Sequence, residues 1–304
     1  MKRVILETPY NGNDWEDIQE NIRFARLCGH DCLARGEAWF ASHLLYTQNG
    51  VLDDRILKER TLGIEAGFAW KEVADATVVY VNRGISKGMH LGIRKTISKG
   101  QPFEYRVLPD YGILTKPKII TITGASGAGK STITRALLEK NPSSRLITSF
   151  TTRPPRESDI AGEYECNLSP EFFADKDNFL WVIQAHGNIY GTTKDSVREA
   201  LSSDGLCFML LAPEVIPVLR GAVAEQSGKD TMVESFYVLS PNAKELERRL
   251  YARGETTVLV QKRVSDCKKW NEEALASDIP YIFISNDKPG VGIDNAIEQM
   301  LVFV

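Results

Sequence analysis

The spacing of hydrophobic residues along this chain changes between a period of two, which favours strands, and a period near 3.6, which favours helices. In the first third, short β-branched runs alternate with amphipathic segments such as 56–73, where Leu62, Ala66, Ala69 and Val73 form one side. We therefore expect strands at 4–8, 77–81 and 103–108, and helices at 14–32, 56–73 and 86–99. This alternation predicts a small parallel sheet with helices on both faces.

The rest of the chain predicts a second, larger α/β unit. A linker with Pro109, Gly112 and Pro117 joins the two, which sets the domains at 1–112 and 117–304. The apolar run 206–211 has the character of a strand buried in a parallel sheet. Strands are expected at 118–123, 145–149, 206–211, 235–239 and 281–285, a helix at 132–140, mixed helix and turn at 171–200, and a charged helical stretch at 243–270.

Composition is that of an ordinary globular protein. The 304 residues are 43% hydrophobic and 25% charged, and the net charge of −3 gives no electrostatic reason to expect nucleic-acid binding. No stretch approaches the ~20 apolar residues of a membrane span, and the N-terminus has too short an apolar run for a signal. Five cysteines then predict reduced thiols and a cytoplasmic protein. Cys28 and Cys32 lie one helical turn apart without a second ligand pair, so we expect no zinc site there.

The segment 124–131 carries the most specific chemistry. It has the pattern G-x-x-x-x-G-K-[ST] between an expected strand and an expected helix, which is typical of a phosphate-binding loop. Backbone N–H groups of such a loop and the helix N-terminus surround an anion. Lys130 is expected to reach the β- and γ-phosphates of ATP, and Ser131 to hold Mg²⁺. The ATP site is thus predicted to contain Gly124, Ser126, Gly127, Gly129, Lys130, Ser131 and Thr132.

Arginines behind this loop suggest where a second substrate binds. Arg153 and Arg156 lie three residues apart in one loop and suit bidentate contacts with a phosphate. Tyr190, in the expected turn 187–192, is placed to reach the same anion. Arg253 and Arg263 lie in the charged helical stretch, from which they are expected to close over the transferring phosphoryl group. The predicted catalytic residues are therefore Lys130, Arg153, Arg253 and Arg263.

From about residue 117 to 304 the chain resembles guanylate kinase, a nucleoside-monophosphate kinase with a P-loop, a parallel sheet and a helical lid. The resemblance rests on the phosphate loop, on the S-x-T-T-R-x-x-R segment 149–156 and on the N-x-Y-G-[ST] turn 188–192. It implies that Asn286 lies beside the ATP adenine, and that Asp159 stands where the family has a supporting glutamate. The acceptor-nucleotide site then comprises Ser149, Arg153, Arg156, Asp159, Tyr164, Trp181, Tyr190 and Thr192.

Two departures from the family pattern concern the acceptor base. Counting back from Tyr190, the guanine-reading glutamate falls on Trp181, or on Leu180 with a one-residue gap. Segment 210–213, where the family has aspartates for Mg²⁺ and the acceptor, contains no acid. A carboxylate accepts from the N1–H and N2–H donors of guanine, whereas an indole N–H does not. We hypothesise that the base is not guanine and that Trp181 stacks on a pyrimidine or modified base; alternatively, Trp181 is a core residue and Ser149 helps to read guanine.

The first 110 residues resemble the nucleoside 2-deoxyribosyltransferase-like superfamily, which has a small Rossmann-like fold. Matching segments are 8–10, 35–37, 43–46, 74–75 and 84–89. The resemblance implies a phosphate or sugar site with Ser86 and Gly88 at a helix N-terminus, near Tyr10. No carboxylate occurs between Asn82 and Lys99, where glycosidase members carry a catalytic glutamate, so a hydrolase would need Glu7, Glu37, Asp53 or Asp54 instead. We expect a nucleotide-binding or degenerate module, through which homo-oligomers are plausible.

Together these features predict an ATP- and Mg²⁺-dependent kinase that converts a (deoxy)nucleoside monophosphate to the diphosphate, with an N-terminal nucleotide-binding domain. One alternative is a bifunctional salvage enzyme whose N-terminal half cleaves or transfers the glycosidic bond of deoxynucleotides. Another is a guanylate-kinase-like binding module. The presence of Lys130 and Ser131 argues against the last, because a scaffold needs neither residue.

Overall fold

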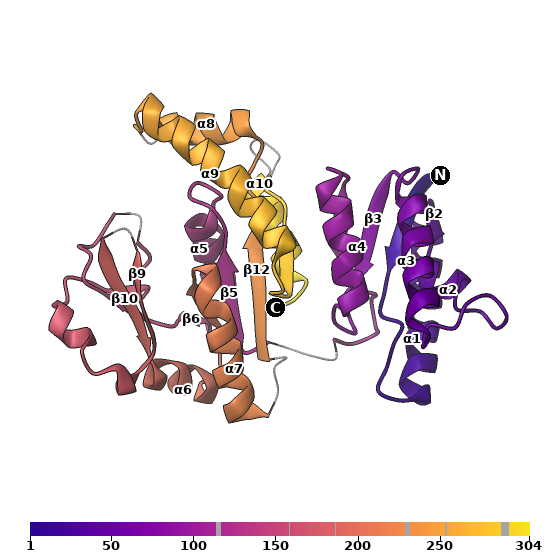
Figure 1. The fold of residues 1–304 in the computed structure, drawn as a ribbon, viewed down its shortest axis with the longest axis horizontal. Coiled ribbons are helices and arrows are strands. Elements are labelled where there is room, and N and C mark those ends of the chain that lie inside the picture. Colours follow the sequence, from indigo (N-terminus) through magenta and orange to yellow (C-terminus); the bar gives the residue numbers. More distant parts are fainter. Residues whose placement is uncertain (114–116, 158, 186, 229–231, 253, 287–291) are drawn as a thin grey trace. The chain divides into compact units, whose positions relative to one another are not determined.

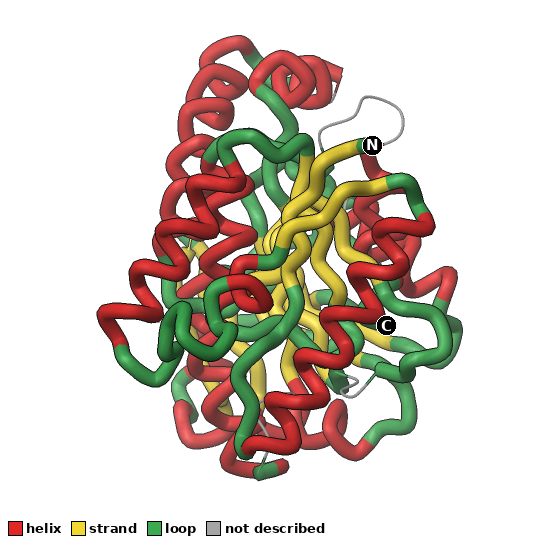
Figure 2. Tube along the Cα trace, turned by 90° about the vertical axis from the view of Figure 1, so that its right-hand side faces the viewer, coloured by secondary structure: helices red, strands yellow, loops and turns green. Residues whose placement is uncertain are grey.

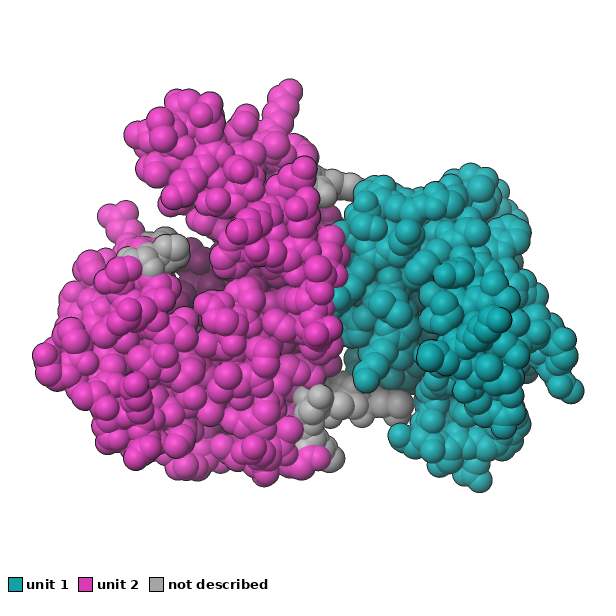
Figure 3. Space-filling view, viewed as in Figure 1, with its two compact units in different colours: residues 1–115 teal, residues 116–304 magenta. Residues whose placement is uncertain are grey.

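The computed structural model describes residues 1–113, 117–157, 159–185, 187–228, 232–252, 254–286 and 292–304. The chain divides into two compact units, Met1–Thr115 and Lys116–Val304, which are coloured separately in Figure 3. Both units combine helices and strands, which are coloured red and yellow in Figure 2. Among the described residues, no helix combines the length and apolar character needed to cross a membrane.

Unit 1 is built on a parallel sheet with the strand order β2-β1-β3-β4. Apolar side chains of β1 and β3, such as Val4 and Val78, pack against Phe24, Cys28 and Cys32 of α1 on one face of the sheet. Helices α3 and α4 lie on the other face, where Lys71 bonds Thr77 and Thr96. The elements are β1 (Lys2–Glu7), α1 (Trp15–Ala34), β2 (Glu37–Phe40), α2 (Ser42–Leu45), α3 (Leu57–Lys71), β3 (Ala76–Tyr80), α4 (Lys87–Ser98) and β4 (Phe103–Arg106).

The expected strands and helices of unit 1 are therefore confirmed, with two additions, β2 and α2. Helix α1 begins where Asp14 accepts a hydrogen bond from the Asp17 N–H at 2.8 Å. Helix α4 begins at its cap residue Ser86, whose hydroxyl accepts from the Met89 N–H at 3.4 Å. Strand β2 was not predicted because its four residues, 37–40, are too few to show the alternation of hydrophobic and polar positions.

Unit 2 has a central parallel sheet with the order β13-β12-β5-β11-β6, of which Figure 1 labels β5, β6 and β12. Strand β5 lies in its middle and is buried along its whole length, which fixes the loop that follows it. Helices α5, α7 and α10 contact the sheet strands. The elements are β5 (Ile119–Thr123), α5 (Lys130–Lys140), β6 (Arg145–Leu146), α6 (Lys194–Ser202), β11 (Cys207–Leu210), η3 (Pro213–Val215), α7 (Ile216–Ser227), β12 (Val233–Val238), α8 (Ala243–Ala252), α9 (Thr257–Ala276), β13 (Tyr281–Ile284) and α10 (Gly292–Leu301).

A second sheet, with the order β8-β7-β10-β9, was not predicted. The expected strand 145–149 is divided, because β6 ends at Leu146 and β7 (Ser149–Thr151) pairs with β10 instead. The expectation of helix and turn at 171–200 was wrong for 179–193, where β9 (Phe179–Ala185) and β10 (Asn188–Thr193) form an antiparallel hairpin. The remaining elements of this region are β8 (Tyr164–Glu165), η1 (Pro170–Phe173) and η2 (Lys176–Asn178).

The charged stretch expected at 243–270 is helical, as predicted, and contains two helices, α8 and α9. They project from the sheet as a helical arm, seen at the top of unit 2 in Figure 1. In Figure 3 the surface of unit 2 is hollowed between this arm and the part that carries β9 and β10. Helices α7 and α10 were not predicted either.

Gly92 in α4 allows a close approach that gives a test of unit 1. A Cβ atom at this position would lie 2.1 Å from Glu7 Oε1, whereas one at Gly88 would lie 3.9 Å from its nearest neighbour. Gly92→Ala should therefore displace Glu7 from its ion pair with Lys71 and destabilise the protein by about 1–3 kcal/mol. Gly88→Ala, the matched control, should be neutral or slightly stabilising because alanine favours helices. Urea denaturation of both variants measures the difference, and equal unfolding free energies would contradict this packing.

Candidate active site

The loop between β5 and α5 is held in a conformation that requires glycine. Gly124 has φ 150° and Gly129 has φ 102°, both in the region that side chains disfavour. A Cβ atom at Gly124 would also lie 2.6 Å from the Val238 carbonyl oxygen, and one at Gly129 would lie 2.8 Å from Asn286 Nδ2. The loop therefore turns tightly between β12 and residue 286, and leads directly into Lys130 at the start of α5. This is the strand–loop–helix arrangement that surrounds a phosphate.

Lys130 points back over the loop rather than into solvent. Its ammonium donates to the carbonyl oxygens of Gly124 at 2.7 Å and Ala125 at 3.0 Å. Ser131 follows in the first turn of α5, with its side chain half-buried. Both side chains thus start from the helix N-terminus, where partial positive charge favours an anion.

A hollow of about 280 Å³ opens beside this loop. The predicted ATP residue Asn286 is buried next to it, and its amide donates to the Ala128 carbonyl at 2.6 Å. Arg249 of α8 donates to the Asn286 carbonyl at 3.4 Å, so Arg249 is a lining residue that the sequence reasoning missed. Its spacing of four residues from Glu245 on a charged helix was the available signal. The hollow is lined by Gly127, Gly129, Thr132, Glu245, Arg248, Arg249, Gly292 and Ile293.

The helical arm touches the phosphate loop through α9. Arg263 donates to the Ser126 hydroxyl at 2.9 Å and to Glu255 at 2.8 Å. Cys267 and Val260 of the same helix pack with Ala125 in a small apolar cluster. Arg263 therefore lies at the loop, in agreement with its predicted position. The other predicted lid residue, Arg253, lies outside the described residues.

The predicted acceptor-phosphate residues converge on a buried ion pair. Arg153 is only 3% exposed, and its two terminal nitrogens donate to the two carboxylate oxygens of Asp159, each at 3.0 Å. Asp159 also accepts from the Arg156 N–H at 2.8 Å. The Arg153 guanidinium lies 5.0 Å from the centre of the Tyr164 ring, whose own centre is 6.0 Å from that of Tyr190. The Arg156 side chain is exposed.

The ion pair shifts the titration of both partners. Burial by itself disfavours both charges. The paired hydrogen bonds and the opposite charges outweigh it, so they hold the pKa of Asp159 below its ordinary value and the pKa of Arg153 above its own. Near them, burial raises the pKa of Glu163, although Lys130 and Arg153 act in the opposite direction. Glu163 was not a predicted site residue.

The predicted base-reading residues are placed differently from one another. Ser149 and Thr192 lie on neighbouring strands with their hydroxyl oxygens 2.9 Å apart. Trp181 pairs with Thr192 across the β9–β10 hairpin, but it is 9% exposed and packs in the core with Ile147, Val197 and other apolar residues. The expectation that Trp181 offers a free face for stacking is therefore corrected. Its large apolar ring is buried in the core, where it packs against the sheet.

The predicted ligand residues of unit 1 lie where its strands end. Ser86 caps α4, Gly88 follows in the first turn, and the ring of Tyr10 lies 6.3 Å from that of His43. His43 is paired with the Thr8 hydroxyl at 2.7 Å, and desolvation lowers its pKa to about 4. These positions follow the carboxyl ends of the strands, where open parallel sheets bind ligands.

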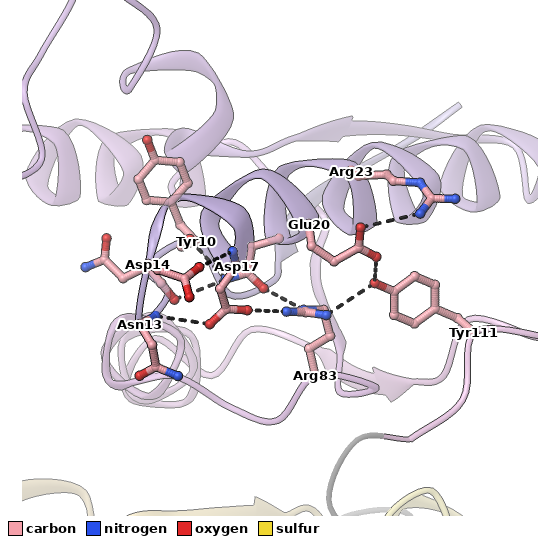
Figure 4. A network of polar contacts seen from close by, with 10 residues as sticks. Tyr10, Asn13, Asp14, Asp17, Glu20, Arg23, Arg83 and Tyr111 are labelled. Atoms are coloured by element: carbon pink, nitrogen blue, oxygen red, sulfur yellow. Dashed lines mark hydrogen bonds and ion pairs between the residues drawn. The ribbon is translucent and has the colours of Figure 1, made fainter.

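Arg83 forms an unpredicted polar network at the same edge (Figure 4). Its guanidinium donates to Asn21 at 2.6 Å, to Asp17 at 2.5 Å and to the Tyr111 hydroxyl at 3.4 Å. Asn21 in turn donates to the carbonyl of Tyr10 at 3.1 Å. The network therefore ties the loop after β3 to α1 and to the segment after β4.

The four acids that were considered as catalysts in unit 1 are all ion-paired. Glu37 is bound by Arg106 at 2.7 and 2.9 Å, Asp53 by Arg55, and Asp54 by Arg60. Glu7 pairs with the buried Lys71 at 2.7 Å and contacts α4 at Gly92. Of the four, we single out Glu7 because its carboxylate lies against the helix that Ser86 begins.

Unit 2 thus joins a phosphate loop, a hollow beside it and an arginine–tyrosine site for a second anion, which defines a P-loop phosphotransferase. Residues 116–297 match the guanylate kinase family, and the chain belongs to that family. It is a nucleoside-monophosphate kinase. Residues 2–106 match a domain of unknown function, DUF7768.

Curated relatives agree with this assignment. Guanylate kinase of Symbiobacterium thermophilum is 34% identical over 178 residues, which cover 57% of this chain and 80% of the relative. Guanylate kinase of Prochlorococcus marinus is 33% identical over 181 residues, which cover 58% of this chain and 92% of the relative. Among solved structures, guanylate kinase from Anaplasma phagocytophilum matches with 17% identity and a TM-score of 0.41, over 62% of this chain and 83% of that one.

The Arg153–Asp159 pair gives a test of the acceptor site. Asp159→Asn removes the charge that holds Arg153, so the KM for the acceptor nucleotide should rise by about tenfold or more, while the KM for ATP changes little. Glu157→Gln, an exposed neighbour in the same loop, is the control. Because the pKa of Asp159 is lowered on folding, its stabilising contribution is complete above its ordinary pKa of about 3.9 and is lost as the pH falls below it. Equal rises in both KM values would contradict a role on the acceptor side.

Proposed function

We propose that this protein transfers the γ-phosphoryl group of ATP to a (deoxy)nucleoside monophosphate and so forms the diphosphate. The observation that supports this most directly is the pairing of a glycine-constrained phosphate loop with the buried Arg153–Asp159 site in one compact unit. Both halves of the reaction need an anion held in place, and each of these features supplies one such place. We also propose that 1–112 and 117–304 act as separate domains, the first binding a nucleotide and offering a surface for homo-oligomers.

In the proposed mechanism, the protein positions two phosphates and offsets their charge. The loop amides and Lys130 hold the β- and γ-phosphates of ATP, and Asn286 lies beside the adenine. Arg153, Arg156, Tyr164 and Tyr190 hold the acceptor phosphate in line. Arg263, which lies at the phosphate loop, and Arg253 stabilise the transferring group and exclude water. The Ser131 hydroxyl would hold Mg²⁺, which would supply positive charge against the ATP phosphates.

Replacement of Lys130 tests the donor side. Lys130→Ala should lower kcat/KM by at least about 100-fold, because the variant loses a fixed positive charge where negative charge develops. Lys140→Ala, at the exposed far end of α5, should leave it unchanged. The measurement is ADP formation in the presence of each nucleoside monophosphate. Undiminished turnover in the Lys130 variant would reject the proposed reaction.

We further infer that the acceptor base is not guanine, in contrast to the substrate that the relatives' name gives. The support is chemical: positions 180, 181 and 210–213 provide no carboxylate for the guanine N–H donors. The burial of Trp181 matches the alternative in which Ser149 helps to read guanine, so the missing carboxylate alone carries this inference. The paired hydroxyls of Ser149 and Thr192 remain beside these positions, and they can both donate and accept. Neutral hydroxyls do not give the charge-assisted bonds that a carboxylate offers to both guanine donors, and this loss, roughly 1–3 kcal/mol, favours a pyrimidine or a modified base.

A panel of acceptors tests this inference. The full-length protein should phosphorylate a pyrimidine or modified monophosphate with a kcat/KM roughly tenfold or more above that for GMP and dGMP, as expected for an unpaired donor. Thermal stabilisation by each monophosphate gives an independent ranking, since binding to the folded state raises Tm. A clear preference for GMP or dGMP would reject the inference and leave the kinase assignment intact.

One observation favours a second candidate function, in which unit 1 cleaves the glycosidic bond of deoxynucleoside monophosphates. The Glu7 carboxylate occupies the space beside Gly92 on α4, so it could replace the acid that this helix lacks. Release of free base from a deoxynucleotide, abolished by Glu7→Gln, would support this function. Absence of any free base from all the common deoxynucleotides would leave a binding module.

A further inference from the structure

Glu163 is a buried acid that the mechanism above does not use. It is 9% exposed and lies between the acceptor loop and strand β8. Its backbone carbonyl accepts from the Ser149 N–H at 3.0 Å, which fixes the residue beside the start of β7. One carboxylate oxygen, Oε2, accepts from the Ile160 N–H at 3.1 Å. Among the described residues, no donor bonds the other oxygen, Oε1.

The loop that carries Glu163 is fastened to the helix that begins at the phosphate loop. Arg135 of α5 donates to the Asp159 carbonyl at 3.3 Å. Ser131 precedes Arg135 by four residues, so the two side chains lie on the same face of α5, one turn apart. The face that presents the Ser131 hydroxyl is therefore the face turned toward the acceptor loop. The charges of Lys130 and Arg153 both act on Glu163, which is consistent with a position between donor and acceptor sides.

The oxygen atoms available here fit Mg²⁺. This ion prefers oxygen ligands, keeps several water molecules and is usually bound through one or two protein groups together with substrate phosphates. Ser131 supplies a hydroxyl, and Glu163 supplies a carboxylate oxygen that has no donor of its own. Segment 210–213, at the end of β11, supplies no acid. No group of three or more histidines, cysteines or acids suited to a metal occurs in the described parts of the chain, so a site completed by the nucleotide is what the residues allow.

We propose that Glu163 is a positioning residue for the metal ion, accepting hydrogen bonds from water molecules on the Mg²⁺ of bound Mg·ATP. This inference rests on the proposed kinase function. Glu163 would fix the ion from the acceptor side, where segment 210–213 cannot. A largely buried carboxylate holds the water molecules on a metal ion more firmly than an exposed carboxylate does, because fewer solvent molecules compete for it.

The test separates binding of the metal from binding of the nucleotide. In Glu163→Gln, the amide oxygen still accepts from the Ile160 N–H, but the charge is gone. Isothermal titration of the full-length variant should show an unchanged Kd for ATP in EDTA and a Kd for Mg·ATP raised by about tenfold, the usual effect of losing a partner that orients metal ligands. Glu165→Gln, an exposed acid two residues away, is the matched control and should bind both forms like the wild type.

Each other outcome contradicts the proposal. An unchanged Kd for Mg·ATP in Glu163→Gln, or equal losses with and without the metal, would assign Glu163 a structural role only. If this variant does not fold, Glu163→Asp is the second test, because it keeps the charge but retracts it by one methylene. It should raise the Kd for Mg·ATP and leave the Kd for ATP in EDTA unchanged. A ratio of these two Kd values equal to that of the wild type would reject the proposal. Failure of the wild-type protein to bind Mg·ATP at all would instead reject the kinase function.

Discussion

The constraint on which unit 2 depends is the sharp turn between β5 and α5. A strand buried on both faces must end at a loop that avoids the Val238 carbonyl on one side and Asn286 on the other. Only glycine satisfies both the positive φ angles and these contacts. The turn therefore aims the N-terminus of α5, with Lys130 and Ser131, at a single place beside the hollow. Three other parts of the site contact this loop or α5: α9 through Arg263, residue 286 through its amide, and the acceptor loop through Arg135.

On the acceptor side, the constraint is that the buried side chain of Arg153 must stay charged and correctly placed to bind an anion. An unpaired guanidinium at 3% exposure would be costly, so Asp159 satisfies it in the absence of substrate. The same carboxylate caps the Arg156 N–H, which couples the conformation of the loop to the ion pair. Tyr164 and Tyr190 complete the surroundings of Arg153 from two strands of the small sheet. Removing any one of these groups therefore affects the placement of the others.

The sequence predicted those features that depend on local spacing. The phosphate loop, the helix starts near Asp14 and Ser86 and the apolar strands 206–211 and 281–285 are all determined by residues close to one another. The hairpin at 179–193 was missed because its strands are stabilised by each other and by the core, and because Gly187 and Tyr190 matched a turn motif more strongly than a strand. Trp181 shows the same limit, since a large aromatic ring suits a core and a ligand equally until its neighbours are known. The positions of Arg249, Glu163 and Arg83 near their sites could not be predicted, because they depend on contacts that the fold creates.

In unit 1, one strand and two helices share a buried network built around an ion pair. Gly92 leaves an empty volume on α4, and the end of β1 fills it with the carboxylate of Glu7. Lys71 reaches the same carboxylate from α3, and Thr77 and Thr96 bind the ammonium, so strand and both helices share one buried network. A buried ion pair of this kind is costly to form and more costly to break, which makes it a poor source of stability but a strong constraint on geometry. The Glu7 carboxylate at this sheet edge is therefore held by β1 and α3. Helix α4, which begins at Ser86, presents its backbone N–H groups and hydroxyls beside that carboxylate.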